Sequence, residues 1–235
     1  MKRLAAMLFV ALSACALHAQ GAVAQMEEDL IPPDRSFVSP ERFGFEFHLG
    51  PYHPDFDGED TFDRFFSDDS GLLVALELDV IGYRMQDTFY LGGGGGIGWA
   101  KFSGNTIDDA GEATSEETEL EIVPLNVIGV FRLDALPRRW GVPFIFTGKL
   151  GYQWMYWTTE SGGSDEANGW SLGLLWAGQV ALDLDTFEPS AARRMDEEWG
   201  INHSFLFFEI SGFEPNSDSL PLGDTSWSVG LGFIM

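Results

Sequence analysis

Apolar and polar residues alternate one by one in many short segments of the chain. In 43–52, FGFEFHLGPY, one parity is apolar and the other holds charged residues and glycine. A period of two fits a β-strand and no helix. Eight segments of this kind follow one another: 43–52, 72–82, 89–102, 121–134, 142–157, 170–184, 203–213 and 226–235. The pattern therefore predicts eight strands.

The two parities differ sharply in chemistry. The apolar parity of the later segments holds Phe144, Phe146, Leu150, Tyr152, Trp154, Trp170, Leu172, Leu174, Trp176 and Val180. The other parity holds Glu46, His48, Glu77, Asp79, Asn126, Arg132, Thr147, Lys149, Gln153, Gln179 and Glu209. Strands of about ten residues that are apolar outside and polar inside are typical of barrels in a bilayer. Because lipid tolerates no open sheet edge, we predict an all-β, eight-stranded antiparallel transmembrane β-barrel.

The connections between the segments alternate in charge. Four of them, 53–70, 103–118, 158–169 and 212–225, hold eighteen acidic residues and a single base, Arg64. The arginines of the other three connections are Arg84, Arg138, Arg139, Arg193 and Arg194. This alternation predicts acidic loops at the cell surface and both chain termini in the periplasm. Within 185–202, the run PSAARRMDEE begins with Pro189 and continues with helix formers, which predicts a short periplasmic helix.

The first 24 residues have the layout of a secretory signal peptide. Lys2 and Arg3 precede an apolar run, and Ala22 and Ala24 form an A-x-A cleavage site. The run LSAC also matches a lipobox, so lipidation of Cys15 is the alternative to ordinary cleavage. The predicted organisation is a signal peptide over 1–24, a periplasmic lead over 25–42 and the barrel over 43–235.

Composition narrows the classes of partner. The chain has 13 Lys and Arg against 37 Asp and Glu, a formal net charge of −24. Such an excess of negative charge repels nucleic acid, which we exclude as a partner. The 20 Phe, 8 Trp and 5 Tyr are too many aromatic residues for a disordered chain.

Several segments carry a resemblance to a known kind of protein. The alternating strands, acidic loops and terminal strand resemble small bacterial outer-membrane barrels of the OmpA, OmpX and OmpW kind. More closely, FGFEFHLGPYHPD, VPLNVIGVFRLD and GINHSFLFFE look like an outer-membrane barrel family of myxobacteria and their relatives. The resemblance implies a location in a Gram-negative outer membrane, with its lipid and lipopolysaccharide as surroundings. It implies a fold and a location but not a reaction.

The terminal strand resembles the signal that the barrel assembly machinery reads during biogenesis. Its outward residues are Trp227, Val229, Leu231, Phe233 and Met235. The chain departs from that signal because Met235 stands where an aromatic residue, usually Phe, is expected. The resemblance nevertheless implies the assembly machinery as a partner.

The segment LGGGGGIG contains a formal nucleotide-binding pattern at Gly93, Gly95 and Gly98. Such a site needs a helix directly after the glycines, but the strand alternation continues through IGWAKF. We therefore interpret Gly92, Gly94, Gly96 and Gly98 as a recess on the lumen face of the third strand. We expect this recess to accommodate Phe205, Phe207 and Glu209 from the seventh strand.

Two groups of residues suggest further chemistry, a hydrolytic site and a metal site. His203, Ser204 and Glu209 suggest a lipid A hydrolase, but adjacent strand residues point to opposite faces, so His203 cannot readily serve Ser204 as a base. We predict no catalytic residue and no enzyme. The acidic runs 55–60 and 107–121 lack the spacing of a calcium loop, so we predict no metal site or cofactor, and weak divalent cation binding at most.

The inward charges should form a network in the lumen. An eight-stranded barrel is just wide enough for its side chains to fill it, and unpaired buried charges are costly. We therefore expect one hydrogen-bonded plug made of Glu46, His48, Glu77, Asp79, Arg132, Lys149 and Glu209. The predicted function is a non-enzymatic envelope barrel for structure or surface interaction. The alternative is a narrow channel or a conduit for small apolar solutes.

Overall fold

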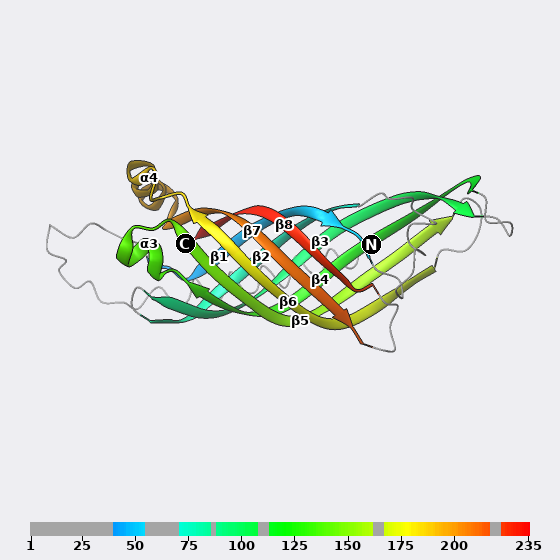
Figure 1. Ribbon diagram of the computed structural model, residues 1–235, viewed down its shortest axis with the longest axis horizontal. Helices are drawn as coiled ribbons and strands as arrows, with labels where there is room; N and C mark the ends of the chain where they lie inside the picture. Colours follow the sequence, from blue (N-terminus) through cyan, green and yellow to red (C-terminus); the bar gives the residue numbers. More distant parts are fainter. Residues whose placement is uncertain (1–39, 55–70, 86–87, 108–112, 162–166, 217–221) are drawn as a thin grey trace, which may run out of the picture. The chain divides into compact units, whose positions relative to one another are not determined.

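The computed structural model describes residues 40–54, 71–85, 88–107, 113–161, 167–216 and 222–235. Within them, eight antiparallel strands form a closed barrel in which β8 pairs with β1 (Figure 1). The strands are β1 (Phe43–Tyr52), β2 (Gly71–Met85), β3 (Phe89–Ile107), β4 (Ala113–Leu133), β5 (Phe144–Ser161), β6 (Ala167–Asp183), β7 (His203–Pro215) and β8 (Asp224–Ile234). The predicted fold class is confirmed. The predicted signal peptide and the acidic run 55–60 lie outside the described residues.

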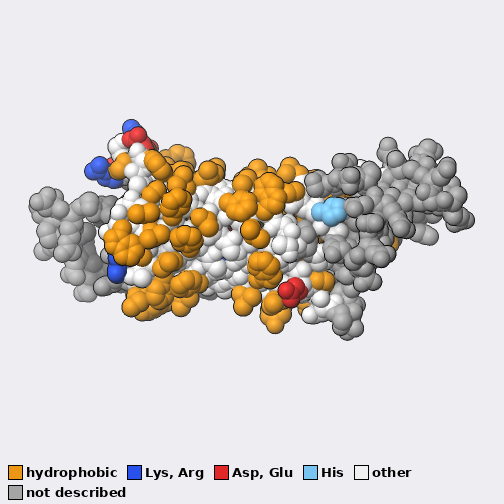
Figure 2. Space-filling model, viewed as in Figure 1, with side chains coloured by type: hydrophobic (Ala, Val, Ile, Leu, Met, Phe, Trp, Pro, Cys, Tyr) orange, Lys and Arg blue, Asp and Glu red, His pale blue; other side chains and the backbone are white. Residues whose placement is uncertain are grey.

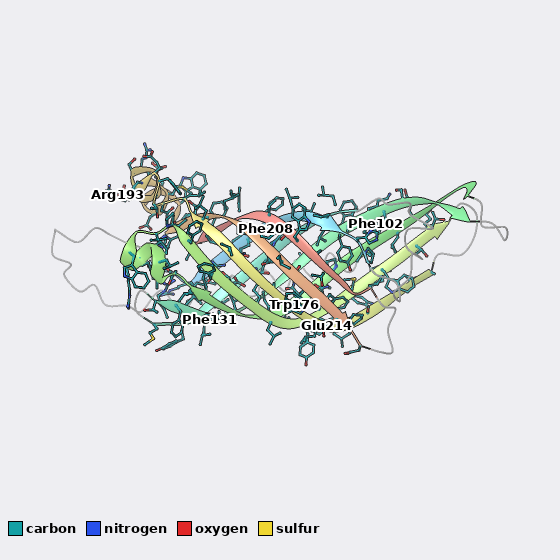
Figure 3. The ribbon with its side chains drawn as sticks, viewed as in Figure 1. Phe102, Phe131, Trp176, Arg193, Phe208 and Glu214 are labelled. Atoms are coloured by element: carbon teal, nitrogen blue, oxygen red, sulfur yellow. The ribbon has the colours of Figure 1, made fainter. Side chains whose placement is uncertain are left out.

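The barrel is apolar outside and polar inside. Leu150 and Tyr152 of β5 are 59% and 57% exposed, whereas Lys149 and Gln153 on the same strand are buried. Phe131 of β4 and Phe208 of β7 point away from the wall (Figure 3). Apolar side chains cover most of the described wall in this view, and the Lys and Arg side chains visible in it lie near one end (Figure 2). This distribution is the reverse of a soluble protein and is typical of a barrel in lipid.

The strand register brings polar residues of neighbouring strands side by side. Glu46 of β1 pairs with Glu77 of β2, and Gln179 of β6 pairs with both Thr147 of β5 and Glu209 of β7. Because side chains alternate between the two faces of a strand, each such pairing places two polar side chains on the lumen side. The register thus places polar side chains of five strands, β1, β2, β5, β6 and β7, in the lumen.

Strands β3, β4, β5 and β6 run on beyond their predicted ends. The segments 103–118 and 158–169, predicted as loops, are mostly strand, and only 108–112 and 162–166 within them lie outside the described residues. The predicted ends were wrong because they marked where apolar alternation stops. A strand that leaves the lipid needs no apolar face, so its sequence no longer alternates.

Two helices lie at the barrel end where β4 and β8 finish. Helix α4 (Pro189–Trp199) matches the predicted periplasmic segment, with proline in its first turn and Gly200 at φ 69° closing it. Helix α3 (Ala135–Trp140) was not predicted, because ALPRRWG was interpreted as a plain connection. Its six residues hold Pro137 in the first turn, where proline is tolerated, and end at Gly141 with φ 65°. Neither described helix is long and apolar enough to cross a membrane.

Candidate functional site

The lumen contains an ion-pair network centred on Glu46. Its carboxylate accepts hydrogen bonds from Lys149 Nζ at 2.7 Å and Gln179 Nε2 at 2.9 Å, and a third from Arg132 Nη2. Four strands, β1, β4, β5 and β6, supply these residues, and all four side chains are buried. A buried carboxylate needs such partners because it has lost its hydration.

Lys149 extends this network to two more carboxylates. Its Nζ lies 2.6 Å from Glu77 Oε1 and 2.9 Å from Glu209 Oε2. His48 lies beside two of these carboxylates. Its Nε2 is 3.4 Å from Glu46 Oε2, and its Nδ1 is 3.6 Å from Glu209 Oε1. The structure thus brings together six of the seven predicted network residues.

Asp79 is the exception. Its side chain is buried, yet within the described part of the chain neither carboxylate oxygen has a hydrogen-bond partner. The network therefore holds four acidic groups, including Asp79, against the two fixed bases Arg132 and Lys149. Asp79 thus differs from Glu46, whose carboxylate accepts hydrogen bonds from three donors.

Apolar side chains close the lumen toward each end. Toward the start of β7 they are Tyr90, Ile128, Val130, Ile145, Ala181, Phe205, Phe207 and Ile234. Toward the end of β1 they are Tyr52, Ala100, Phe102, Leu120, Ile122, Met155, Phe213 and Leu222. Arg132 joins the network to the first group, since its guanidinium lies 4.6 Å from the Phe205 ring centre and 5.4 Å from that of Tyr90.

The lumen glycines of β3 leave room for residues other than those expected. A Cβ at Gly94 would lie 2.0 Å from Asp79 Oδ1, and one at Gly98 would lie 2.9 Å from Pro124 Cγ. A Cβ at Gly96 would lie 3.0 Å from the Asn126 amide, and one at Gly92 would lie 2.6 Å from the Val80 carbonyl oxygen. The space is thus used by the neighbouring strands β2 and β4.

The expected occupants of this recess lie against different glycines. Phe207 comes within 2.3 Å of a Cβ built at Gly230, and Phe205 within 2.1 Å of one at Gly232. Both glycines belong to β8, the hydrogen-bonded neighbour of β7. Phe205 and Phe207 thus lie against the glycines of β8, whereas the atoms nearest to the lumen face of the β3 glycines belong to β2 and β4.

The terminal strand β8 joins β1 to close the ring. Trp227, Val229, Leu231 and Met235 are exposed on its outer side, and Phe233 is half-buried. The Met235 carbonyl oxygen accepts hydrogen bonds from the Arg42 and Phe43 amides, at 2.7 and 2.6 Å. The last residue thus takes part in ring closure through its backbone.

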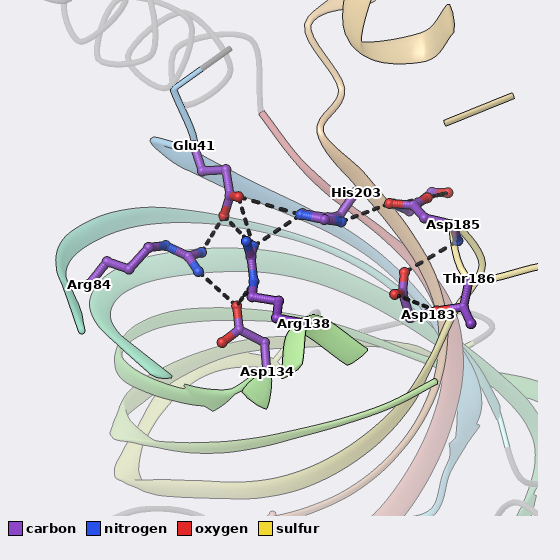
Figure 4. Close-up of polar contacts among 9 residues, drawn as sticks. Glu41, Arg84, Asp134, Arg138, Asp183, Asp185, Thr186 and His203 are labelled. Atoms are coloured by element: carbon purple, nitrogen blue, oxygen red, sulfur yellow. Dashed lines mark hydrogen bonds and ion pairs between the residues drawn. The ribbon is translucent and has the colours of Figure 1, made fainter. Parts of the chain in front are cut away.

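A second charged cluster lies at the barrel mouth beside α3 (Figure 4). Glu41, just before β1, accepts hydrogen bonds from Arg138 Nη2 at 2.7 and 2.8 Å and contacts Arg84 Nη2. Asp134 accepts from Arg84 at 2.8 Å and from Arg138 Nε at 2.7 Å. His203 Nε2 lies 3.4 Å from Glu41 Oε1. We call Glu41, Arg84, Asp134, Arg138 and His203 the mouth cluster.

The mouth cluster perturbs the pKa of Glu41. Burial alone would raise that pKa, but the hydrogen bond with His203 and the positive charge of Arg138 outweigh it. The pKa falls from 4.5 to about 2. Burial likewise opposes the charge of Arg138, while the negative charges of Glu41 and Asp134 raise the pKa of its guanidinium. The two chain segments around α3 and before β1 are thus joined by charge-assisted bonds.

The sequence prediction missed the mouth cluster because Arg84 and Arg138 were assigned to plain connections between strands. The β2–β3 register shifts between Ile81 and Tyr83, so Tyr83 is exposed and Arg84 pairs with the buried Tyr90. Strict alternation from Asp79 would have placed Arg84 outside, and a bulge reverses that parity. One signal in the sequence could have pointed to the cluster. Glu41 and Asp134 each stand next to the end of a strand that reaches this mouth, and Arg138 lies in the connection that follows Asp134.

His203 and Ser204 do not form a hydrolytic pair. Both bind Asp185, which lies 2.7 Å from His203 Nδ1 and accepts from Ser204 Oγ at 3.0 Å. Glu209 belongs to the lumen network and not to this group. The arrangement holds the start of β7 to the connection after β6.

Three groups bring possible metal ligands within 4.8 Å of one another: Glu46, His48 and Glu209; Asp183, Asp185 and His203; Glu46, Glu77 and Asp79. In the first and third, Lys149 already lies against two of the carboxylates. In the second, His203 already bonds to Asp185. Four of the six carboxylates in these groups, Glu46, Glu77, Asp185 and Glu209, therefore have a basic partner within the chain.

Two cavities of the barrel share no lining residue. One of about 480 Å³ opens at the mouth and is lined by Arg132, Tyr90 and four residues of the mouth cluster, Arg84, Asp134, Arg138 and His203. Another of about 650 Å³ lies inside the barrel beside Lys149 and Glu209, and it shares no lining residue with the first. Arg132 lines the first cavity and Lys149 lines the second, so Glu46, which bonds to both, lies between them.

Comparison with known proteins adds three similar structures. No family model and no curated protein matches the chain. The attachment invasion locus protein Ail of Yersinia pestis, solved with the heparin analogue sucrose octasulfate, is 10% identical with a TM-score of 0.48, over 85% of this chain and 100% of Ail. The N-terminal β-barrel domain of Pseudomonas aeruginosa OprF is 8% identical (TM-score 0.42; 83% and 100% covered). Neisserial surface protein A is also 8% identical (TM-score 0.44; 83% and 97% covered).

Proposed function

We propose that this chain is a closed, non-conducting and non-enzymatic barrel of a Gram-negative outer membrane. Residues 1–24 direct its export, both termini lie in the periplasm, and the acidic connections face the outside. Its role is envelope structure or surface interaction through those connections. The apolar exterior supports the membrane location, since Val127, Leu150 and Tyr152 are each more than half exposed at the level of the lumen charges.

The observation that carries this function is the occupied lumen. Glu46, Arg132, Lys149 and Gln179 meet at the barrel axis, and Phe205 and Tyr90 lie directly against Arg132. An ion would have to cross both layers. Because the interior of an eight-stranded barrel is only about wide enough for side chains to fill, a lumen crossed by these two layers holds no continuous water path.

Recordings from planar bilayers test the proposal. The purified chain should give no steady single-channel steps under an applied voltage. An Arg132→Ala variant removes the residue that joins the ionic and aromatic layers and should admit small currents. Phe208→Ala, on the lipid side of β7, is the matched control and should stay silent.

Large and steady steps from the unmodified chain would overturn the proposal and favour the narrow channel. A small apolar molecule retained on purification, and lost in the Arg132→Ala variant, would favour the conduit. Silence in the unmodified chain together with currents in the Arg132→Ala variant would support a barrel closed by its own side chains.

A further inference from the structure

Helix α4 stands beside the barrel wall at the mouth (Figure 1). Both flanks are tied to the wall: the Leu184 amide donates to the Ser204 carbonyl at 2.9 Å, and the Asn202 amide donates to the Ile234 carbonyl at 2.7 Å. The helix is therefore held at the level where β7 begins and β8 ends. No residue of α4 is buried.

The helix is amphipathic. At 3.6 residues per turn, Ala191, Ala192, Met195 and Trp199 fall within an arc of about 100°. Glu197 lies on the opposite side, and Arg193 projects from the helix among the polar residues (Figure 3). A helix with this division has one face that gains from contact with an apolar medium.

Large aromatic side chains around α4 are open to the surroundings. Trp199 at the helix end is 76% exposed, and Phe187 just before the helix is 62% exposed. Trp140, at the end of α3 on the same mouth, is 67% exposed. Tryptophan gathers at membrane interfaces because its ring is apolar while its N–H remains hydrated.

The position of α4 matches the edge of the lipid-facing surface. Leu206 and Phe208 are the first exposed apolar residues of β7, and Leu206 comes three positions after His203. Three residues of a strand span about 10 Å, and less along the membrane normal because barrel strands are tilted. The headgroup layer on each side of the hydrocarbon core is roughly 5–8 Å thick. Helix α4 thus lies next to that layer.

We propose that α4 is an interfacial anchor whose apolar face enters the phospholipid headgroup layer on the mouth side of the membrane. The inference rests on the proposed membrane location. The polar side of α4 carries the positive charges of Arg193 and Arg194. It also carries the negative charges of Asp196, Glu197 and Glu198, so electrostatics gives no net attraction to anionic lipid. The contact therefore depends on apolar burial and should be insensitive to salt and to the content of anionic lipid.

Site-specific labelling tests the anchor in the barrel reconstituted without residues 1–24, which then has no other cysteine. The variants are Trp199→Cys on the apolar face, Glu197→Cys opposite it and Phe208→Cys on the lipid side of β7. Each receives an environment-sensitive fluorophore in phosphatidylcholine vesicles, with spin-labelled lipids as quenchers at shallow or deep positions.

The label at 199 should be blue-shifted and quenched mainly by the shallow spin label, and that at 197 should emit as in water. The label at 208 should respond to the deep quencher.

Two outcomes separate the inference from the function it rests on. A water-like label at 199 with a quenched label at 208 would overturn the anchor and leave the membrane barrel intact. An unquenched label at 208 would overturn the membrane location itself. Phe187→Cys, just before the helix, gives a second measurement beside the apolar face should the variant at 199 fail to fold. About a tenfold rise in salt should leave the emission at 199 unchanged, and loss of the blue shift would contradict apolar insertion.

Discussion

At the scale of single residues, two buried carboxylates in the same lumen have opposite surroundings. Glu46 accepts from Lys149, Arg132 and Gln179. Asp79, one strand away, has no hydrogen-bond partner among the described residues and lies over Gly94. The same chemical group should therefore contribute to stability with opposite sign at the two positions.

Glu46→Gln should destabilise the barrel by about 3–5 kcal/mol, because it leaves two buried cations without their shared carboxylate. Asp79→Asn should be neutral or stabilising, because it removes a buried charge that no donor compensates. Urea unfolding in lipid, followed by tryptophan fluorescence, measures both. Equal losses in the two variants would show that the Asp79 carboxylate is compensated in the folded barrel.

The glycine recess makes a second prediction at this scale. Gly94→Ala should cost about 1–3 kcal/mol, since the new methyl group meets the Leu78 carbonyl at 2.6 Å as well as Asp79. Gly93→Ala is the matched control on the outer face, where the nearest atom lies at 3.5 Å. Gly95 is not a suitable control, because a Cβ there would lie 2.9 Å from the Asn126 carbonyl oxygen. The same unfolding assay should rank the two variants, and equal stability would refute the recess.

The mouth cluster makes the stability of the barrel pH-dependent. The pKa of Glu41 is about 2 in the folded chain against 4.5 unfolded. Its ionised form therefore stabilises the fold above pH 4.5, and that contribution is lost as the pH falls toward 2. The loss amounts to at most about 3 kcal/mol. Unfolding measured at pH 6 and pH 3 should show a larger decrease in the unmodified chain than in Glu41→Gln, and parallel decreases would contradict it.

Alternation of residue types was sufficient to predict which side chains face the lumen, but not which of them touch. The inward parity of Glu46, Glu77 and Lys149 follows from a period of two. The approach of Lys149 to three carboxylates depends on the stagger between strands, which no single segment encodes. Arg84 was out of reach for another reason, since one extra residue at the β2 bulge reverses its side.

At the scale of elements, strand number was predictable and strand length was not. Lipid selects an apolar face, and that face ends where the lipid ends. β4 continues to Ala113, far beyond its last apolar alternation. Helix α3 escaped prediction because six residues with a proline give no helical period, whereas α4, with 11 residues and a proline start, does.

The last strand carries a prediction about assembly. Met235 pairs through its backbone with Phe43 at 2.8 Å, and its side chain is 37% exposed on the outer side. Met235→Phe supplies the aromatic terminus that the assembly machinery is expected to read, without touching those backbone bonds. The variant should raise the fraction of folded protein in membranes of expressing cells, scored by its mobility on gels before boiling. Met235→Ser is the control and should lower that fraction. No difference between the two would remove Met235 from the signal.

At the scale of the whole molecule, closure is the dominant property. Every described strand has two hydrogen-bonded neighbours, since β8 pairs with β1. Unfolding must break the ring at some pair, and the remaining strands then expose edges that lipid does not tolerate. The barrel should therefore unfold as one cooperative unit.

Heat modifiability measures this property. Unboiled protein should migrate on a detergent gel at a position different from boiled protein, because the closed ring resists detergent at room temperature. Intermediate temperatures should give two bands and no others. A continuous series of bands would mean that the strands come apart in stages, and a single position throughout would mean that the ring is not closed in detergent.

The unequal lengths of the strands make the two flanks of the barrel differ in height. β3, β4, β5 and β6 have 19, 21, 18 and 17 residues, whereas β1 and β8 have 10 and 11. A crossing needs about 9–11 residues. The surplus of roughly eight residues, tilted by about 45°, lifts the ends of the long strands some 20 Å above the short ones. An antibody or phage tail approaching that face would meet a sloping rim, so its footprint would cover the β3–β6 flank first and leave the seam between β1 and β8 sheltered.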